Sequence, residues 1–136
     1  MSGFEVRTLV ADRLRATVPA RSVFEGAVPS GSLPECFLLV RTNEGAEGAS
    51  RMVGTVSLQR PSIWVTSVSL DVSPPVACDE AAAGAAFVRQ ALRNWSPVSG
   101  GWRLVAEVSE PARPDGSLPN AAAYAAVEQF SVRLAL

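Results

Sequence analysis

Apolar side chains recur at helical spacing near the start of the chain. The four that would share one face are Val6, Val10, Leu14 and Val18. Ser2 and Glu5 have the spacing of a capping box, in which each side chain satisfies a backbone amide at the helix start. Pro19 disfavours helical geometry in the residue before it. The pattern predicts a helix over residues 2–18.

Short apolar segments separated by turn residues come next. The pair Val23-Phe24 indicates a short strand, and residues 26–34 carry the glycines and prolines typical of a loop. Residues 36–40 are apolar without interruption, so both faces of a strand there would be buried. This run predicts a central strand of a sheet.

Residues 42–51 contain no large apolar side chain and predict a long, exposed hairpin loop. A return strand is expected over residues 52–59, ended by Pro61. Residues 62–72 then alternate with the period of a strand. The face expected to be buried carries Trp64, Thr66, Val68, Leu70 and Val72, and the opposite face carries Ser67, Ser69 and Asp71.

A second helix is predicted over residues 79–95, after a break at Pro74-Pro75. Asp79 is a suitable N-cap, and the alanines that follow favour helix. Gly84 inside the helix indicates either a tolerated cost or the close approach of another backbone. The expected buried stripe consists of Ala82, Ala85, Ala86, Phe87, Val88, Ala91, Leu92 and Trp95.

Two strands complete the predicted fold. The first covers residues 102–109, with Trp102, Leu104, Ala106 and Val108 on one face. The proline-rich residues 110–120 predict a crossing loop. The last strand covers residues 130–136, and the alanine-rich segment 121–127 is interpreted as its extension. The order of elements predicts an α+β fold: a single, mostly antiparallel β-sheet with two helices packed on one face.

Composition narrows the possible functions. The length of 136 residues and an apolar fraction of 48% indicate a single globular domain over residues 1–136. The absence of histidine excludes Ser-His-Asp and Cys-His catalysis and every histidine metal site. All 12 basic residues are arginine, which excludes lysine Schiff bases. A net charge of −1 predicts no strong affinity for nucleic acid or an anionic membrane.

The cysteines and the N-terminal residues bear on the compartment. Cys36 and Cys78 fit no paired-cysteine metal or redox motif, so we interpret them as reduced, apolar side chains of a cytosolic protein. Residues 1–20 are interrupted by charges, unlike a signal peptide. No stretch reaches the ~20 apolar residues that a membrane span needs.

Carboxylates are the remaining candidates for metal chemistry. Asp71 and Glu107 would be neighbours if their strands paired, and they would then suit Mg²⁺. The wider pool consists of Asp71, Asp79, Glu80, Glu107, Glu110 and Asp115. A solvated strand face and a helix cap explain these residues without a metal, and we favour that interpretation. Gly-x-Ser-x-Gly and phosphate-loop motifs are absent. We therefore expect no catalytic residue, cofactor or metal.

Two groups of residues are candidate contacts with other molecules. Arg89 and Arg93 lie four apart on the second predicted helix, so they share a face that would meet another subunit or DNA. A solvated helix end explains the same pair. The loop is long enough to reach a partner. Its candidate contact residues are Glu44, Gly45, Glu47, Gly48 and Arg51.

The order of segments resembles that of tail terminator (tail completion) proteins of long-tailed bacteriophages. The resemblance spans nearly the whole chain and rests on segment order, length and one loop. It begins with a helix that leads to Val23-Phe24-Glu25-Gly26, and then to the loop Val28-Pro29-Ser30-Gly31-Ser32-Leu33-Pro34 before the strand Cys36–Val40. Later come Ala91-Leu92 and Trp95 at a helix end, the strand Trp102–Glu107, a loop with Pro111 and Asp115, and a final strand with Tyr124 and Phe130.

The resemblance implies a structural virion protein of the head–tail neck with no catalysis. Such a protein forms a hexameric ring that caps the tail tube, ends tail polymerisation and joins the tail to the head-completion (stopper) protein. Genomic DNA passes through the lumen, where contact would be non-specific. The implied location is the head–tail junction of the virion, and the host cytoplasm during assembly.

Three alternatives stay open at the level of sequence. The nearest is another neck or head-closure adaptor of similar size. A carboxylate-dependent metal hydrolase would use Asp71 and Glu107. A small cytosolic binding module would hold an apolar ligand between the helices and the sheet.

Overall fold

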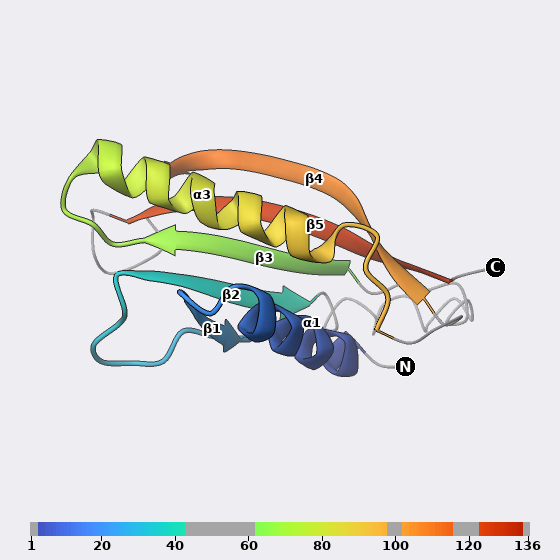
Figure 1. Ribbon diagram of the computed structural model, residues 1–136. Helices are drawn as coiled ribbons and strands as arrows, with labels where there is room; N and C mark the ends of the chain where they lie inside the picture. Colours follow the sequence, from blue (N-terminus) through green and yellow to red (C-terminus); the bar gives the residue numbers. More distant parts are fainter. Residues whose placement is uncertain (1–2, 43–61, 98–101, 116–122, 135–136) are drawn as a thin grey trace, which may run out of the picture.

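The described part of the chain folds into one sheet with two helices on it (Figure 1). The computed structural model describes residues 3–42, 62–97, 102–115 and 123–134. In chain order the elements are α1 (Gly3–Thr17), β1 (Ser22–Glu25), β2 (Cys36–Thr42), β3 (Ser62–Ser69), α3 (Pro74–Leu92), β4 (Trp102–Pro114) and β5 (Tyr124–Leu134). The predicted α+β class is confirmed.

The sheet has five strands in the order β1-β2-β3-β5-β4. β1 runs parallel to β2, and the other three pairings are antiparallel, so the sheet is mixed. The loop over residues 26–34 makes the parallel connection. As predicted, β2 is an inner strand: Leu38 and Val40 are buried on one face and Phe37 on the other.

Both helices lie on the same face of the sheet, as Figure 1 shows. The predicted stripe of α1 is buried there, and Ser2 of the predicted capping box lies outside the described residues. We call the apolar side chains between the helices and the sheet the helix-side core. Its members include Val6, Val10, Leu14, Leu38, Val40, Ile63, Val65, Val88, Leu92, Trp102, Leu104, Phe130 and Val132. Burial of this layer supplies most of the hydrophobic stabilisation.

The opposite face of the sheet carries a smaller apolar group. Phe37, Val68, Ala123 and Ala125 are buried there, and side chains of the 26–34 loop, Val28 and Leu33, pack against them. The rings of Phe24 and Phe37 meet edge to face with centroids 5.5 Å apart. The loop therefore covers one end of a face that the helices leave open.

The predicted buried face of β3 is only partly right. Thr66 and Val68 are buried on it, but Ser67 and Ser69 of the opposite face are buried as well. Ile63 and Val65 point into the helix-side core, whereas Trp64 lies on the other face and is half-buried. β3 ends at Ser69, and Val72, expected inside the strand, is 89% exposed. The period-two alternation of residues 62–69 correctly predicts a strand. Because an inner strand is covered on both faces, the face with the larger side chains is not the one that belongs to the helix-side core.

Truncation of Trp64 should therefore cost less than a core mutation. We expect Trp64→Ala to lower the free energy of unfolding by about 1.5 kcal/mol, because only part of the indole leaves an apolar contact. Phe130→Ala, a truncation of a fully buried ring in the same sheet, is the comparison and should cost more. Urea titration of both variants measures the difference, and an equal loss would show that Trp64 is a core residue.

The second helix begins earlier than predicted. α3 starts at Pro74, with Ser73 rather than Asp79 as its N-cap. Proline is accepted at the first helical positions, where no backbone amide donor is required. The buried residues are Ala77, Ala81, Gly84, Ala85, Val88, Ala91 and Leu92. Ala82, Ala86 and Phe87, expected in the stripe, face solvent instead, because the helix is rotated relative to the predicted stripe.

The strand β4 is also longer than predicted. It continues through the expected proline-rich loop to Pro114, with register shifts between Ala106 and Val108 and between Glu110 and Arg113. An edge strand tolerates such irregularities and prolines, because the amide groups on its outer side make no hydrogen bonds to a further strand. The face predicted for residues 102–109 does not continue past the first register shift. Trp102 and Leu104 before it are buried, whereas Val108 after it is 48% exposed. The extension of the last strand back to Tyr124 is confirmed.

Candidate functional site

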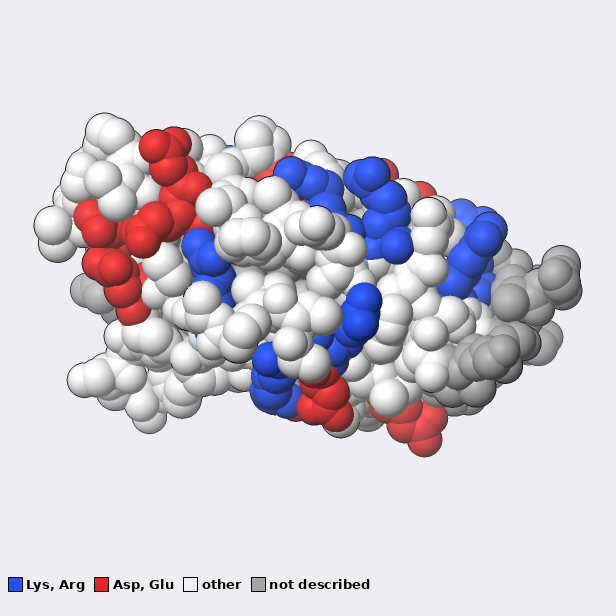
Figure 2. Space-filling view, viewed as in Figure 1, with Lys and Arg blue, Asp and Glu red and all other residues white. Residues whose placement is uncertain are grey.

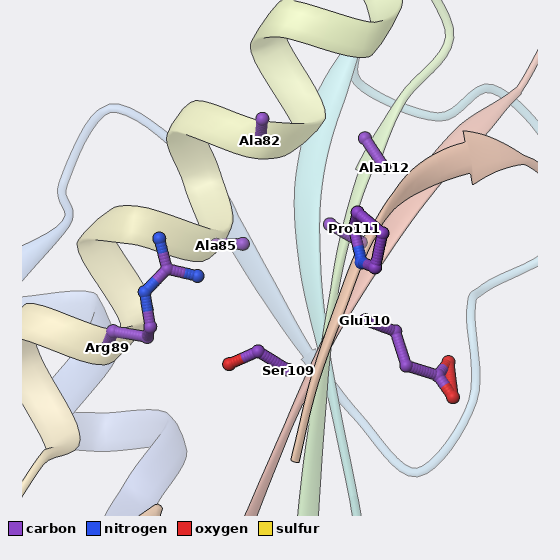
Figure 3. Close-up of a pocket in the computed structure, with 8 residues that line it drawn as sticks. Ala82, Ala85, Arg89, Ser109, Glu110, Pro111 and Ala112 are labelled. Carbon is purple, nitrogen blue, oxygen red and sulfur yellow. The ribbon is translucent and has the colours of Figure 1, made fainter.

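A hollow of the described surface lies between α3 and the edge strand β4. It has a volume of about 300 Å³. Figure 3 shows Ser109 pointing from the strand toward the helix that carries Arg89, while Glu110 points away from the helix. Alanines and a proline make the remaining wall. The pocket is lined by Ala82, Ala85, Arg89, Ser109, Glu110, Pro111, Ala112 and Ala126.

A buried carboxylate lies beside this pocket. Glu128 of β5 is 1% exposed, and its Oε1 accepts hydrogen bonds from Arg89 Nη1 at 2.7 Å and from Ser109 Oγ at 3.0 Å. Its other oxygen, Oε2, is buried without a hydrogen-bond partner among the described residues. Burial of an unpaired carboxylate costs folding free energy. The ion pair with Arg89 offsets this cost for Glu128.

The two predicted contact arginines have different surroundings. Arg89 is committed to Glu128 through one of its nitrogen atoms and keeps 37% of its side chain exposed. Arg93, the C-cap residue of α3, is exposed and has no side-chain partner in the described part of the chain. Both line a second, more open hollow of about 470 Å³, formed with Ala86, Gln90 and Asn94. The expectation that they share a face is confirmed.

The predicted metal pair is not brought together. Glu107 binds Ser131 and Arg133 on the neighbouring strand, with Ser131 Oγ donating at 2.5 Å and Arg133 Nη2 at 3.0 Å. These contacts lower the pKa of Glu107. Ser131 pairs with Ser62 at the start of β3, whereas Asp71 follows the other end of that strand. A strand of this length separates the two carboxylates by roughly 20 Å.

Asp71 instead belongs to an acidic group at the N-terminal end of α3, which also contains Glu35 and Glu80. A hydrogen bond with Asp71, followed by the negative charge of Glu80, raises the pKa of Glu35. Glu80 accepts a hydrogen bond from buried Ser69 at 2.9 Å. Figure 2 shows these acidic side chains gathered at one end of the molecule.

The potential ligand atoms of Glu35, Cys36 and Glu80 lie within 4.8 Å of one another. They are the residues on this side of the domain that could surround a cation, and sequence analysis included only Glu80 among its candidates. Burial raises the pKa of the Cys36 thiol, which disfavours the thiolate that binds metals. The carboxyl group of Glu35 is hydrogen-bonded with Asp71, and that of Glu80 accepts a hydrogen bond from Ser69. These contacts explain why the three side chains lie close together without a metal. Cys36 and Cys78 are free thiols.

Sequence analysis missed the buried Glu128. A signal was present, because residue 128 has the parity of Phe130 and Val132, whose side chains face the helices. An acid on the apolar face of a strand requires a cation from the covering helix. The predicted contact loop, with Glu44, Gly45, Glu47, Gly48 and Arg51, lies outside the described residues, as does the predicted return strand 52–59.

No helix in the described part of the chain combines the length and the apolar character that crossing a membrane would take. No protein-family model matches the chain, and a search among curated proteins finds no match.

Proposed function

We propose that the protein is a structural subunit of the phage head–tail neck that forms a hexameric ring on the tail tube. In this role it ends tube polymerisation, binds the head-completion protein and performs no catalysis. The basis is the similarity of segment order to tail terminator proteins. Among the described residues, the pocket between α3 and β4 is lined by Arg89, whose charge is neutralised by the buried Glu128, and it does not bring reactive groups together.

One structural observation is relevant to assembly: the outer face of the sheet, away from the helices, carries apolar side chains that the described residues leave partly exposed. Leu39, Trp64 and Val127 are half-buried there. Val108 of the edge strand β4 lies on the same face, because it pairs with Gln129, which pairs with Trp64 on its other side, and it is 48% exposed. A closed ring requires two different patches on each subunit, one binding the other around the symmetry axis. We assign one of these two patches to the outer face of the sheet.

The variant Val108→Glu tests this assignment. A charge introduced at the ring contact should weaken assembly about tenfold, equivalent to roughly 1.4 kcal/mol, and leave the fold unchanged. Val72→Glu is the matched control, because Val72 is 89% exposed and lies outside the strands of the sheet. Light scattering across a concentration series measures assembly against a subunit mass of 14.3 kDa. Equal effects of the two variants would contradict the assignment.

The function itself is tested on tail tubes. The protein is added to polymerising tail tube protein, and the lengths and ends of the tubes are measured by electron microscopy. We expect shorter tubes, each with extra density at one end. Binding to the head-completion protein without any effect on tubes would assign the chain to a neighbouring neck adaptor instead. Absence of both activities would refute the proposal.

The metal-hydrolase alternative loses its basis, because its two carboxylates lie near opposite ends of β3. The ligand-binding module is not favoured by a particular feature either. The helix-side core is filled by apolar side chains with near-zero exposure, and the hollow between α3 and β4 is open to solvent.

A further inference from the structure

The outward face of α3 has an uncommon distribution of side chains. Six exposed residues follow one another at helical spacing along this face, and we call them the α3 outer stripe. They are Asp79, Ala82, Ala83, Ala86, Gln90 and Arg93. An acid therefore stands at one end, an arginine stands at the other, and small side chains lie between them.

The two charges are placed symmetrically. Asp79 and Arg93 each lie seven positions from Ala86, which is the middle of the stripe. The distance between the two ends is about 21 Å along the helix axis. Among the described residues neither side chain has a hydrogen-bond or ion-pair partner, whereas Arg89 on the same helix is paired with Glu128.

We infer that the α3 outer stripe binds the same stripe of a second copy of this chain, with the two helices antiparallel and a two-fold axis at Ala86. In that arrangement Asp79 of each copy faces Arg93 of the other, so two ion pairs form and all four charges are neutralised. A two-fold contact is self-complementary by symmetry, and a stripe that is acidic at one end and basic at the other meets that condition. The antiparallel arrangement also aligns the two helix dipoles favourably.

The middle of the stripe suits close packing. Alanines on facing helices permit an interaxial distance near the lower end of the usual range of about 8–10 Å. Phe87, 46% exposed, and Val76, 44% exposed, flank the stripe and would lose exposed apolar surface in the pair. The ring of Phe87 is held by the guanidinium of Arg21 at 5.6 Å, so this apolar side chain is already positioned.

Charge distribution distinguishes a second copy from other partners. A nucleic acid would favour arginines along the whole face and would be repelled by Asp79. Figure 2 shows the opposite arrangement, with acidic atoms toward the N-terminal end of α3 and arginines toward its C-terminal half. The contact is independent of the proposed ring, because ring contacts join unlike surfaces and this one joins like surfaces.

The test uses two single charge reversals, Asp79→Arg and Arg93→Glu. Each variant alone places like charges opposite each other twice in the pair, so its dimer dissociation constant should rise at least about tenfold. A mixture of the two variants restores both ion pairs in the heterodimer and should regain dimerisation, as should the double variant. Sedimentation velocity measures the dimer at twice the 14.3 kDa subunit mass.

A cysteine at the two-fold axis tests the register separately. In a chain with Cys36 and Cys78 replaced by alanine, Ala86→Cys should form a covalent dimer under mild oxidation, because identical residues meet at the axis. Ala16→Cys, at an exposed alanine of α1, is the matched control and should remain monomeric on a denaturing gel.

Several outcomes overturn the inference. A strictly monomeric wild-type protein would do so, as would single reversals without effect or a mixture that fails to recover. A hexamer that is insensitive to both reversals would refute this contact and leave the ring intact. A wild-type protein that dimerises but does not cap tail tubes would refute the proposed function and leave this contact intact.

Discussion

Arg89→Met is expected to destabilise the fold by about 3 kcal/mol, because it leaves the carboxylate of Glu128 buried without its cation. Arg89 Nη1 lies 2.7 Å from Glu128 Oε1, and Glu128 is only 1% exposed. The expected loss lies at the lower end of the range for broken buried pairs. Arg89 itself is 37% exposed, so water can replace part of the lost interaction.

A double-mutant cycle separates this effect from simple loss of packing. Glu128→Met removes the buried charge, so Arg89→Met in that background should cost much less than in the wild type. Urea unfolding followed by circular dichroism gives the four free energies. Arg103→Met is the matched control, because Arg103 is an exposed arginine of β4 outside this pair, and its loss should change stability by less than about 0.5 kcal/mol. Similar losses for both arginines would contradict a special role for the Arg89–Glu128 pair.

Gly84→Leu is expected to cost about 3 kcal/mol through overpacking between α3 and the sheet. Gly84 is buried, and a Cβ placed on it would overlap Ser67 Oγ and lie 3.1 Å from both Ser67 Cβ and Arg21 Nε. Ser67 is itself 1% exposed and belongs to β3, so it has little room to move. Even Gly84→Ala should destabilise, although glycine to alanine inside a helix normally stabilises by about 1 kcal/mol.

The sign of the Gly84→Ala effect is the decisive measurement. Ala83→Gly at the adjacent exposed position reports the ordinary helix preference and should cost about 1 kcal/mol. Removing the hydroxyl with Ser67→Ala should reduce the penalty of Gly84→Ala, since the nearest overlapping atom is then gone. Thermal and urea unfolding of these variants measure each term. A stabilising Gly84→Ala would show that α3 and β3 are not in close contact there.

The fold class followed from local patterns, and these patterns are physically strong ones. The four-residue spacing of Val6, Val10 and Leu14 predicts a helix wherever the segment lies, and the continuous apolar run 36–40 requires two covered faces. Gly84 was identified as a possible close approach of another backbone because glycine is costly in a helix interior; the structure places the side chains of Ser67 and Arg21 there instead.

The predictions that failed depended on how the elements are placed against one another. The rotation of α3 decides that Ala82 and Ala86 face solvent, and alanine is too small and too weakly apolar to signal its own burial. The buried face of β3 was misassigned because an inner strand is covered on both sides. The edge position of β4 allows prolines inside a strand, which local preferences alone exclude.

The sequence by itself determined the α+β class, the two helices of the described residues and the exclusion of histidine and lysine chemistry, since each follows from composition or from contacts between neighbours in the chain. Only the tertiary structure decided which charges meet. Arg89 and Glu128 are 39 residues apart and are joined because α3 crosses β5, while Asp71 and Glu107 are separated because β5 lies between β3 and β4. Electrostatic pairing depends on distances of a few ångström between remote segments, and those distances arise from packing, which no local pattern specifies.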